Sequence, residues 1–282
     1  MRNDLSSKLL RVAKWQRNLF FKKWNALRSD PEIWEKPLEE RLELILHVLP
    51  ESPPYALKGP HRFVTLLQKE YPRLLLQLPQ PPLGLFVWGA ELTDEIKIGV
   101  VGSRKPTAYT QRMSREFSLI WGRLGFPIVS GGALGIDACA HEACLEAGGR
   151  TIAILGSGFN HLYPRSHQGL FRKILGNRGT LVSELAPEVA PRAHFFPERN
   201  RIIAAMSHLV FLAQAHERSG SLSTARAALD LGRDVSVLRP VAGDEAFAGS
   251  KALIEAGAPS IIEAGQIFEA GRRDISLPTH ST

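Results

Sequence analysis

Three short segments combine glycines with serines or with an arginine, and each lies close to the end of an apolar run. They are residues 102–104, 130–137 and 219–224. Glycine lets backbone N–H groups approach an anion closely, and the N-terminus of a following helix adds a favourable dipole. Together the three segments predict a site for a phosphorylated ligand, with purely structural turns as the alternative.

The spacing of these glycines argues against the common nucleotide cofactors. The chain contains neither the G-x-G-x-x-G dinucleotide fingerprint nor the G-x-x-x-x-G-K-[ST] phosphate loop. We therefore expect no bound cofactor.

A fourth segment, residues 192–204, concentrates arginines and aromatic rings. Arg192 precedes Phe195 by three residues, and Arg199-Asn200-Arg201 follows. Single strands of nucleic acid are commonly held by bases stacked on aromatic rings and by arginines on the backbone. The alternative is that the rings are core residues and Arg199 pairs with an acid, and composition does not decide between the two.

Two further patterns invite a catalytic or metal-site interpretation. Asp137 and His141 are four residues apart on one expected helix, so an acid–base pair is conceivable, although a structural role is favoured. Cys139, His141 and Cys144 do not predict a metal site. Positions 139 and 141 cannot face one ligand on a helix, and no second pair of ligands follows.

The net charge of +7 is carried by one short segment. Residues 1–28 hold eight of the 35 basic side chains and one of the 28 acidic ones, so the remaining residues are neutral overall. Any polyanion site in the body must therefore be a local cluster. The segment itself has the pattern of a basic amphipathic helix, which suits nucleic acid, an acidic partner, a membrane surface, a targeting peptide or simply a solvated helix.

The elements that position these residues follow from the apolar runs. Six short runs alternate with helix-like segments, at 98–101, 127–129, 151–155, 180–182, 209–212 and 234–238. This alternation predicts an α/β protein with a Rossmann-like, doubly wound, mostly parallel sheet, with ligands at the carboxyl ends of the strands. No apolar stretch is long enough to cross a membrane, and two cysteines fit a reducing cytoplasm.

The part of the chain before the sheet is expected to be small and helical. Residues 38–49 and 61–71 have helix-like patterns, and proline-rich breaks follow each of them. We therefore predict a helical N-terminal region with its basic arm over residues 1–82, and the Rossmann-like core over residues 83–282.

Several long motifs follow one another in a fixed order between residues 71 and 262. They are Tyr71-Pro72, Val100-Val101-Gly102-Ser103-Arg104, the stretch 130–137 with Ala140-His141, 147–151, 155–158, Tyr163-Pro164, Ser183-Glu184, 196–204, 219–225, Gly232-Arg233 and Leu253-Ile254. In this order they resemble the DprA/Smf family of DNA-processing proteins.

The resemblance implies a protein that binds single-stranded DNA, acts as a homodimer, protects incoming DNA in natural transformation and loads the RecA recombinase, with no established catalytic activity. Arg104 matches the family's DNA-contacting arginine, and Arg192 and Phe195 match its basic residue and stacking aromatic. The full set of expected DNA-binding residues is Ser103, Arg104, Gly131, Gly132, Arg192, Phe195, Arg199, Asn200, Arg201, Gly220, Ser221 and Lys251.

The chain departs from the family pattern at Gln214, at Arg239-Pro240 and at Lys251, and no winged-helix tail is expected after residue 258. The alternative function is that of the related lysine-decarboxylase-like (LOG) phosphoribohydrolases, which act on nucleotides. That reading needs a P-G-G-x-G-T-x-x-E loop with a catalytic glutamate, which residues 219–226 lack.

Overall fold

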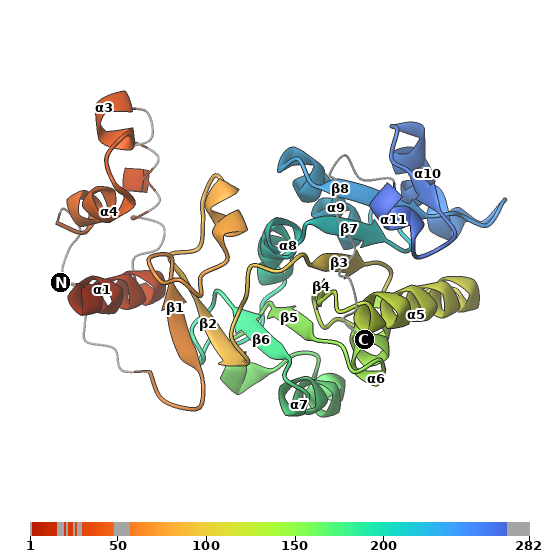
Figure 1. The fold of residues 1–282 in the computed structure, drawn as a ribbon, viewed down its shortest axis with the longest axis horizontal. Coiled ribbons are helices and arrows are strands. Elements are labelled where there is room, and N and C mark those ends of the chain that lie inside the picture. The colour runs from red at the N-terminus through yellow and green to blue at the C-terminus, as the bar shows by residue number, and fades with distance from the viewer. Residues whose placement is uncertain are drawn as a thin grey trace, which may run out of the picture.

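The protein is described by a computed structural model, which covers residues 2–15, 20, 22–24, 26, 30–47 and 57–269 (Figure 1). A large sheet crosses the molecule, and the N-terminal helices lie beside its outer edge. Parts of the basic arm, including Arg17 and Arg28, lie outside the described residues.

The described part of the chain forms one nine-stranded sheet in the order β1-β2-β6-β5-β4-β3-β7-β8-β9. From β6 to β9 all neighbouring strands are parallel, whereas β1 and β2 are antiparallel additions at one edge. The strands are β1 (Arg62–Thr65), β2 (Gly84–Gly89), β3 (Ile98–Val101), β4 (Ile128–Ser130), β5 (Thr151–Leu155), β6 (Thr180–Ser183), β7 (Leu209–Leu212), β8 (Asp234–Leu238) and β9 (Ser260–Ile261).

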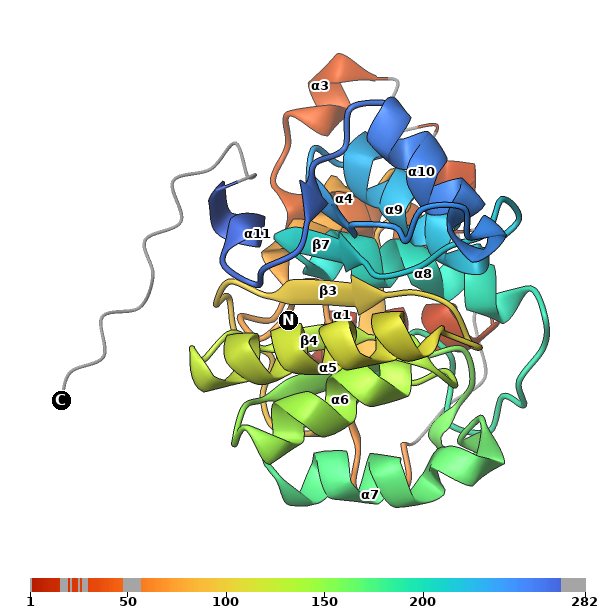
Figure 2. The same ribbon diagram turned by 90° about the vertical axis from the view of Figure 1, so that its right-hand side faces the viewer.

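Helices cover both faces of the sheet, as the end-on view shows (Figure 2). One face carries α5, α6 and α7, and the other carries α8, α9 and α10. The helices are α1 (Arg2–Trp15), α3 (Pro31–Trp34), α4 (Leu38–His47), α5 (Ala108–Arg123), α6 (Ile136–Glu146), α7 (Gln168–Gly176), α8 (Phe195–Met206), α9 (Gly220–Asp230), α10 (Ala248–Glu255) and α11 (Gln266–Glu269), with short 3-10 turns at η1 (Arg73–Gln77), η2 (Phe159–His161), η3 (Arg165–His167) and η4 (Glu245–Phe247). The predicted Rossmann-like, doubly wound fold is therefore confirmed.

The strand order places the switch of direction where the sequence motifs converge. From β3 the chain winds outward through β4, β5 and β6, and then α8 carries it back to β7 on the other side of β3. The ends of β3, β4 and β7 therefore diverge around one crevice, which is the usual ligand position in such sheets. All residues of β3, β4 and β7 are buried, which explains their continuous apolar runs.

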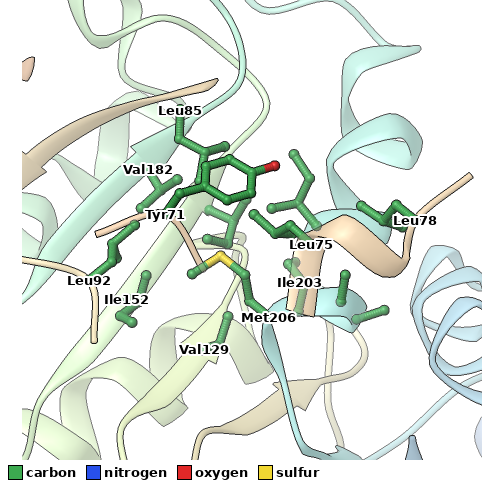
Figure 3. Packing of buried hydrophobic residues seen from close by; sticks show 14 of the residues in the cluster. Tyr71, Leu75, Leu78, Leu85, Leu92, Val129, Ile152, Val182, Ile203 and Met206 are labelled. Carbon is green, nitrogen blue, oxygen red and sulfur yellow. The ribbon is translucent and has the colours of Figure 1, made fainter. Parts of the chain in front are cut away.

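The segment that leads into the core is packed against it. Tyr71 and Leu75 are fully buried and belong to the same apolar cluster as Ile203 and Met206 of α8 and Val129 of β4 (Figure 3). The Tyr71 hydroxyl donates a hydrogen bond to the Pro82 carbonyl over 2.7 Å. The lead-in motif is thus part of the hydrophobic core.

The prediction of a helix over residues 61–71 is wrong. Residues 61–71 contain β1, which pairs with β2 so that Phe63 faces Phe86 across the two strands. Phe63, Val64 and Thr65 favour a strand once a partner is available, and that partner lies beyond the local sequence. β1 thus joins the same sheet as the core, and the division of the chain at residue 82 stays a prediction. The other expected helix is present as α4, while residues 48 and 49 lie outside the described part.

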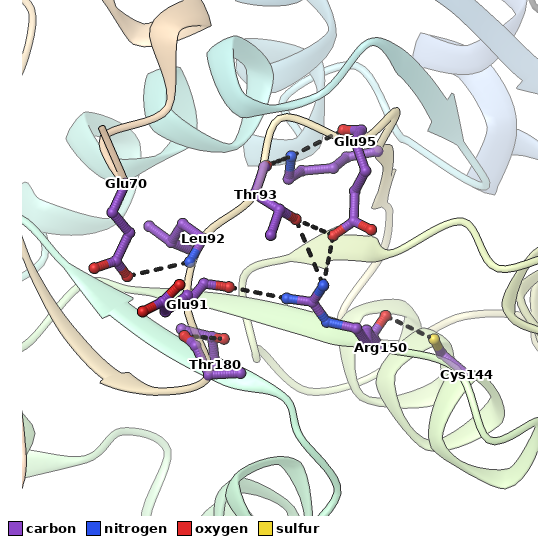
Figure 4. Close-up of polar contacts among 10 residues, drawn as sticks. Glu70, Glu91, Leu92, Thr93, Glu95, Cys144, Arg150 and Thr180 are labelled. Atoms are coloured by element: carbon purple, nitrogen blue, oxygen red, sulfur yellow. Dashed lines mark hydrogen bonds and ion pairs between the residues drawn. The ribbon is translucent and has the colours of Figure 1, made fainter. Parts of the chain in front are cut away.

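The connection from β2 to β3 is fixed by polar contacts at the end of the sheet opposite the crevice (Figure 4). Arg150 donates to the Glu91 carbonyl and to the Glu95 carboxylate, over 2.9 and 2.8 Å. Glu70 accepts from the backbone N–H of Leu92 over 3.1 Å. These contacts give Arg150 a structural role at the end of the sheet away from the ligand site.

The basic arm is partly anchored. Leu5, Leu9 and Val12 of α1 are buried in the core cluster, whereas Lys22 and Lys23 are exposed. Within the described residues, no helix combines the length and apolar character that crossing a membrane requires.

Candidate functional site

A pocket of about 910 Å³ lies at the crevice, between the end of β3, the loop after β7 and the first turns of α8 and α9. Its lining includes five cationic side chains and a single carboxylate. The cations are Arg104, Lys105, Arg192, Arg199 and Arg218, and the carboxylate is Asp137. A neutral body thus gathers positive charge at the predicted edge of its sheet, as a local cluster.

The turn after β3 presents Ser103 and Arg104 to the pocket. The Ser103 hydroxyl accepts a hydrogen bond from the backbone N–H of Lys105 over 3.0 Å, which shapes the turn. Arg104 is exposed, and its guanidinium carbon lies 5.7 Å from the centroid of the Phe196 ring. No ion pair joins Arg104 to an acidic side chain of the described residues, so its charge is available to a ligand.

The backbone of the loop after β4 binds a carboxylate of the protein itself, that of Asp137. The Asp137 carboxylate accepts hydrogen bonds from the N–H groups of Gly131 and Ala133, over 3.1 and 3.2 Å. The N–H of Gly131 is therefore already used, which the sequence did not show. Gly132 packs beside Phe171, and its carbonyl contacts the His167 ring, so it does not line the pocket.

Arg199 is buried beneath this loop. Its guanidinium donates to the carbonyls of Gly131 and Ile154, and a side chain at position 131 would collide with it. Burial lowers the pKa of Arg199 to about 10, against the opposing effect of Asp137. Burial also raises the pKa of the Asp137 carboxyl, while Arg199 lowers it. Arg199 is thus fixed mainly by the fold, although part of it reaches the pocket lining.

The next two predicted residues are also held by protein groups. Asn200 donates to the Gly220 carbonyl and the Ser223 hydroxyl, over 3.2 and 2.9 Å, and so joins α8 to α9. Arg201 forms an ion pair with Glu184, in which Nη2 donates to both carboxylate oxygens over 2.7 Å, and it lies outside the pocket lining. The alternative considered from the sequence had Arg199 pair with an acid, but the arginine of this motif that forms an ion pair is Arg201.

The first turn of α9 presents two hydroxyls and one backbone N–H to the pocket. The Ser219 hydroxyl caps the helix by accepting from the N–H of Ser221, and the two hydroxyls lie 2.7 Å apart. Gly220 is exposed, and no described residue accepts a hydrogen bond from its N–H. Of the three glycines predicted to face an anion, Gly220 is the one that lines this pocket, and its N–H has no acceptor among the described residues.

Three predicted residues remain. Arg192 is exposed and lines the pocket, whereas Phe195 lies outside the lining with its ring 4.2 Å from that of His194. Its neighbour Phe196 lines the pocket instead. Lys251 also lies outside, and its ammonium donates to the Asp244 carbonyl over 3.3 Å. Roles for Phe195 and Lys251 in binding stay predictions from the resemblance.

Several lining residues were not among those predicted to bind DNA. They include Lys105, Tyr163, His216 and Arg218. Lys105 directly follows the segment 102–104, and Arg218 directly precedes the segment 219–224. Extending each of these two segments by one residue would have included them. Tyr163 lies in a motif that carried the resemblance, but only the fold brings its ring beside Phe196, at 5.4 Å.

Asp137 and His141 have separate partners, so the pairing considered from the sequence does not form. The Thr151 hydroxyl donates to the Ile128 carbonyl over 2.9 Å and lies 2.6 Å from His141 Nδ1. His141 therefore donates from Nδ1, and its buried Nε2 has no partner among the described residues. A proton on Nε2 would be desolvated, and burial accordingly lowers the pKa of His141 to about 3, with smaller effects from His167 and Arg199.

This histidine gives an expected pH dependence. Below pH 6.5 the unfolded chain takes up a proton on His141 that the folded protein does not bind, so stability falls as the pH falls. We expect the His141 contribution to shrink by about 3 kcal/mol between pH 7 and pH 4. Urea unfolding of the parent and of His141→Gln across this range isolates the His141 contribution. The raised pKa of Asp137 makes stability rise as the pH falls, but it does so in both proteins and cancels in the comparison. Parallel pH profiles for the two proteins would contradict the assignment.

The described residues contain no group of three or more His, Cys, Asp and Glu side chains arranged to hold a metal ion. The Cys139 and Cys144 thiols are buried against backbone carbonyls, and burial raises the pKa of Cys144 to about 12. Both thiols are therefore protonated at neutral pH.

Comparison with known proteins gives consistent matches. The sequence model of the DNA recombination-mediator protein A family matches residues 62–272. The DNA processing protein DprA of Bacillus subtilis is 40% identical over 208 residues, which cover 73% of this chain and 70% of that protein. Two further curated relatives are matched over 56% and 53% of their lengths.

Solved structures agree with the sequence matches. The X-ray structure of DprA from Streptococcus pneumoniae superposes with a TM-score of 0.72 at 29% identity, covering 93% of this chain and 95% of that one. DNA processing protein A from Helicobacter pylori, described for its single-stranded DNA binding mode, gives a TM-score of 0.66 at 29% identity and covers 74% and 94% of the two chains.

Proposed function

The chain belongs to the DNA recombination-mediator protein A family, known as DprA/Smf, and from that premise we propose that it binds single-stranded DNA in the basic pocket. The observation that carries the proposal is the exposed Arg104 at the end of β3, which has no acidic partner among the described residues. The open N–H of Gly220 and the cations Lys105, Arg192 and Arg218 line the same pocket. A guanidinium and a free backbone N–H together suit a phosphate diester.

The proposed role is binding without catalysis. The one carboxylate in the lining, Asp137, is buried and already accepts two backbone hydrogen bonds, so it is poorly placed to assist cleavage of a glycosidic bond. The phosphoribohydrolase alternative needs a carboxylate that can reach a nucleotide, and no glutamate lines the pocket. Release of free base from a panel of nucleotides would favour that alternative.

The wider role rests on the family. We propose that the protein protects incoming single strands in the cytoplasm and loads RecA on them, and that it acts as a homodimer. The single-stranded DNA binding mode of the similar Helicobacter pylori protein supports the binding on which both roles depend.

The decisive experiment compares single-stranded and duplex oligonucleotides over a range of salt. We expect tighter binding of the single strand with little base preference, and an affinity that falls as salt rises, because each phosphate contact releases counterions. Fluorescence anisotropy with labelled strands measures both trends. Equal affinity for duplex, or no response to salt, would overturn the proposed function.

A further inference from the structure

The basic arm, residues 1–28, carries the net charge of the protein but takes no part in the pocket. No acidic residue occurs between Asp4 and Asp30, whereas the rest of the chain after residue 28 is neutral overall. The pocket at the crevice has cations of its own, and none of its lining residues comes from the arm. The charge of the arm is therefore available for a contact outside the crevice.

The apolar side of the arm is used by the fold. Leu5, Leu9 and Val12 lie on one side of α1 and are buried in the core cluster, where α1 packs beside β1 and β2 (Figure 1). Phe20 and Trp24 are buried in the same cluster, and their rings stack with centroids 6.0 Å apart. A basic amphipathic helix binds a membrane by inserting its apolar side. Here that side is already covered, which argues against a membrane surface as the partner.

The cationic side of the arm faces solvent. Lys22 and Lys23 directly precede Trp24 on a helical stretch, and both are exposed. Neither lysine forms an ion pair with an acidic side chain of the described residues. Helix α4 meets the arm here with a cation, since the Arg41 guanidinium carbon lies 5.7 Å from the centroid of the Trp24 ring. The surface around Lys22 and Lys23 thus suits a polyanion.

The arm begins at the same edge of the sheet as the crevice. Ser183, the last residue of β6, faces Phe86 of β2, so Gly84 at the start of β2 lies beyond the carboxyl end of β6. Thr65 of β1 faces Gly84, and its hydroxyl lies 3.5 Å from that of Ser6 in α1. Five strand spacings of about 4.8 Å separate β1 from β3, which gives roughly 24 Å along this edge.

We propose that the basic arm is a second contact for the phosphate backbone of a single strand that leaves the crevice along this edge, with Lys22 and Lys23 among its contacts. The inference rests on the proposed function. At the phosphate spacing of duplex DNA, about 3.4 Å per strand, a path of roughly 24 Å takes about 7 nucleotides, and an extended strand needs fewer. Lysines act on phosphates as point charges and read no base. The arm therefore adds affinity for long strands, without sequence preference.

The test varies the length of an oligothymidylate with the full chain as the protein. Lys22→Gln/Lys23→Gln is expected to weaken binding of a strand of about 20 nucleotides by roughly 2- to 30-fold at low salt. The slope of log affinity against log salt should become shallower by about 1.4, or about 0.7 for each lysine. A strand of about 4 nucleotides is too short to reach from the crevice to the arm, so its affinity should change by less than about twofold. Fluorescence anisotropy in competition measures both strands.

Two control variants accompany the test. Arg172→Gln/Lys173→Gln neutralises an adjacent, exposed pair of cations on α7, outside the pocket lining, and should bind both strands like the parent. Lys22→Arg/Lys23→Arg keeps the charge of the arm and should also bind like the parent. Thermal melting checks that each variant folds, which is expected because the side chains changed are exposed.

The outcomes separate the arm from the crevice. If Lys22→Gln/Lys23→Gln binds the long strand like the parent, or loses the same affinity for both strands, the arm is not a second contact. If strand affinity is unchanged but binding to vesicles of anionic phospholipid is lost, the arm binds a membrane surface and the inference is overturned. If the parent binds no oligothymidylate of any length, the proposed function itself falls and the inference with it.

Discussion

Arg199→Ala is expected to lower the free energy of unfolding by about 3–5 kcal/mol, because it removes one member of a buried set of charges and leaves the others uncompensated. The guanidinium donates to the carbonyls of Gly131 and Ile154 and balances the charge of Asp137. Without it, both carbonyls and a buried carboxylate lose a partner at the end of β4. Urea unfolding followed by circular dichroism measures the loss.

Two comparisons sharpen this experiment. Arg199→Lys keeps the charge but lacks the planar set of donors that serves two carbonyls, so an intermediate loss is expected. Arg172→Ala, which removes an exposed arginine from α7, should leave stability nearly unchanged. If Arg199→Ala is as stable as the parent but binds single-stranded DNA weakly, then Arg199 is a direct ligand contact and the structural assignment is wrong.

The sequence predicts the sheet well because its signal is local. Strands β3 to β8 are almost entirely buried, so each appears as a short apolar run regardless of its neighbours, whereas β2 and the two-residue β9 were not predicted. The order of these runs and the rule for doubly wound sheets are enough to bring the end of β3 to the crevice. Arg104 could therefore be placed correctly from its position one turn after the strand.

The same reasoning fails where the partner of a residue is distant. Arg199 and Arg201 look alike in the sequence, but one is buried against Gly131 and the other pairs with Glu184. Nothing in the spacing of residues 199–201 shows which arginine is buried and which forms the ion pair. Likewise Phe195 and Phe196 are adjacent at the start of α8, and only the orientation of this helix decides that the Phe196 ring lines the pocket and the Phe195 ring does not.

Arg104 is exposed in the crevice and should contribute to DNA binding and little to stability, whereas the buried Arg199 should contribute mainly to stability. Arg104→Ala is expected to leave the melting temperature nearly unchanged, since the side chain is exposed and its guanidinium lies over the face of Phe196 without an acidic partner among the described residues. A charged hydrogen bond to a phosphate contributes about 1.5–3 kcal/mol, so its loss should weaken binding of single-stranded DNA by roughly 10- to 150-fold. Fluorescence anisotropy at fixed salt measures this change.

The salt dependence then tells a lost phosphate contact from a general disturbance of the site. Each phosphate neutralised on a single strand contributes about 0.7 to the slope of log affinity against log salt, so Arg104→Ala should make that slope shallower by about this amount. Arg172→Ala removes the same charge from the surface of α7, away from the pocket lining, and should leave both affinity and slope close to those of the parent. If folded Arg104→Ala binds like the parent, Arg104 does not contact the phosphate backbone and the proposed role of this residue is wrong, even though Lys105, Arg192 and Arg218 line the same pocket.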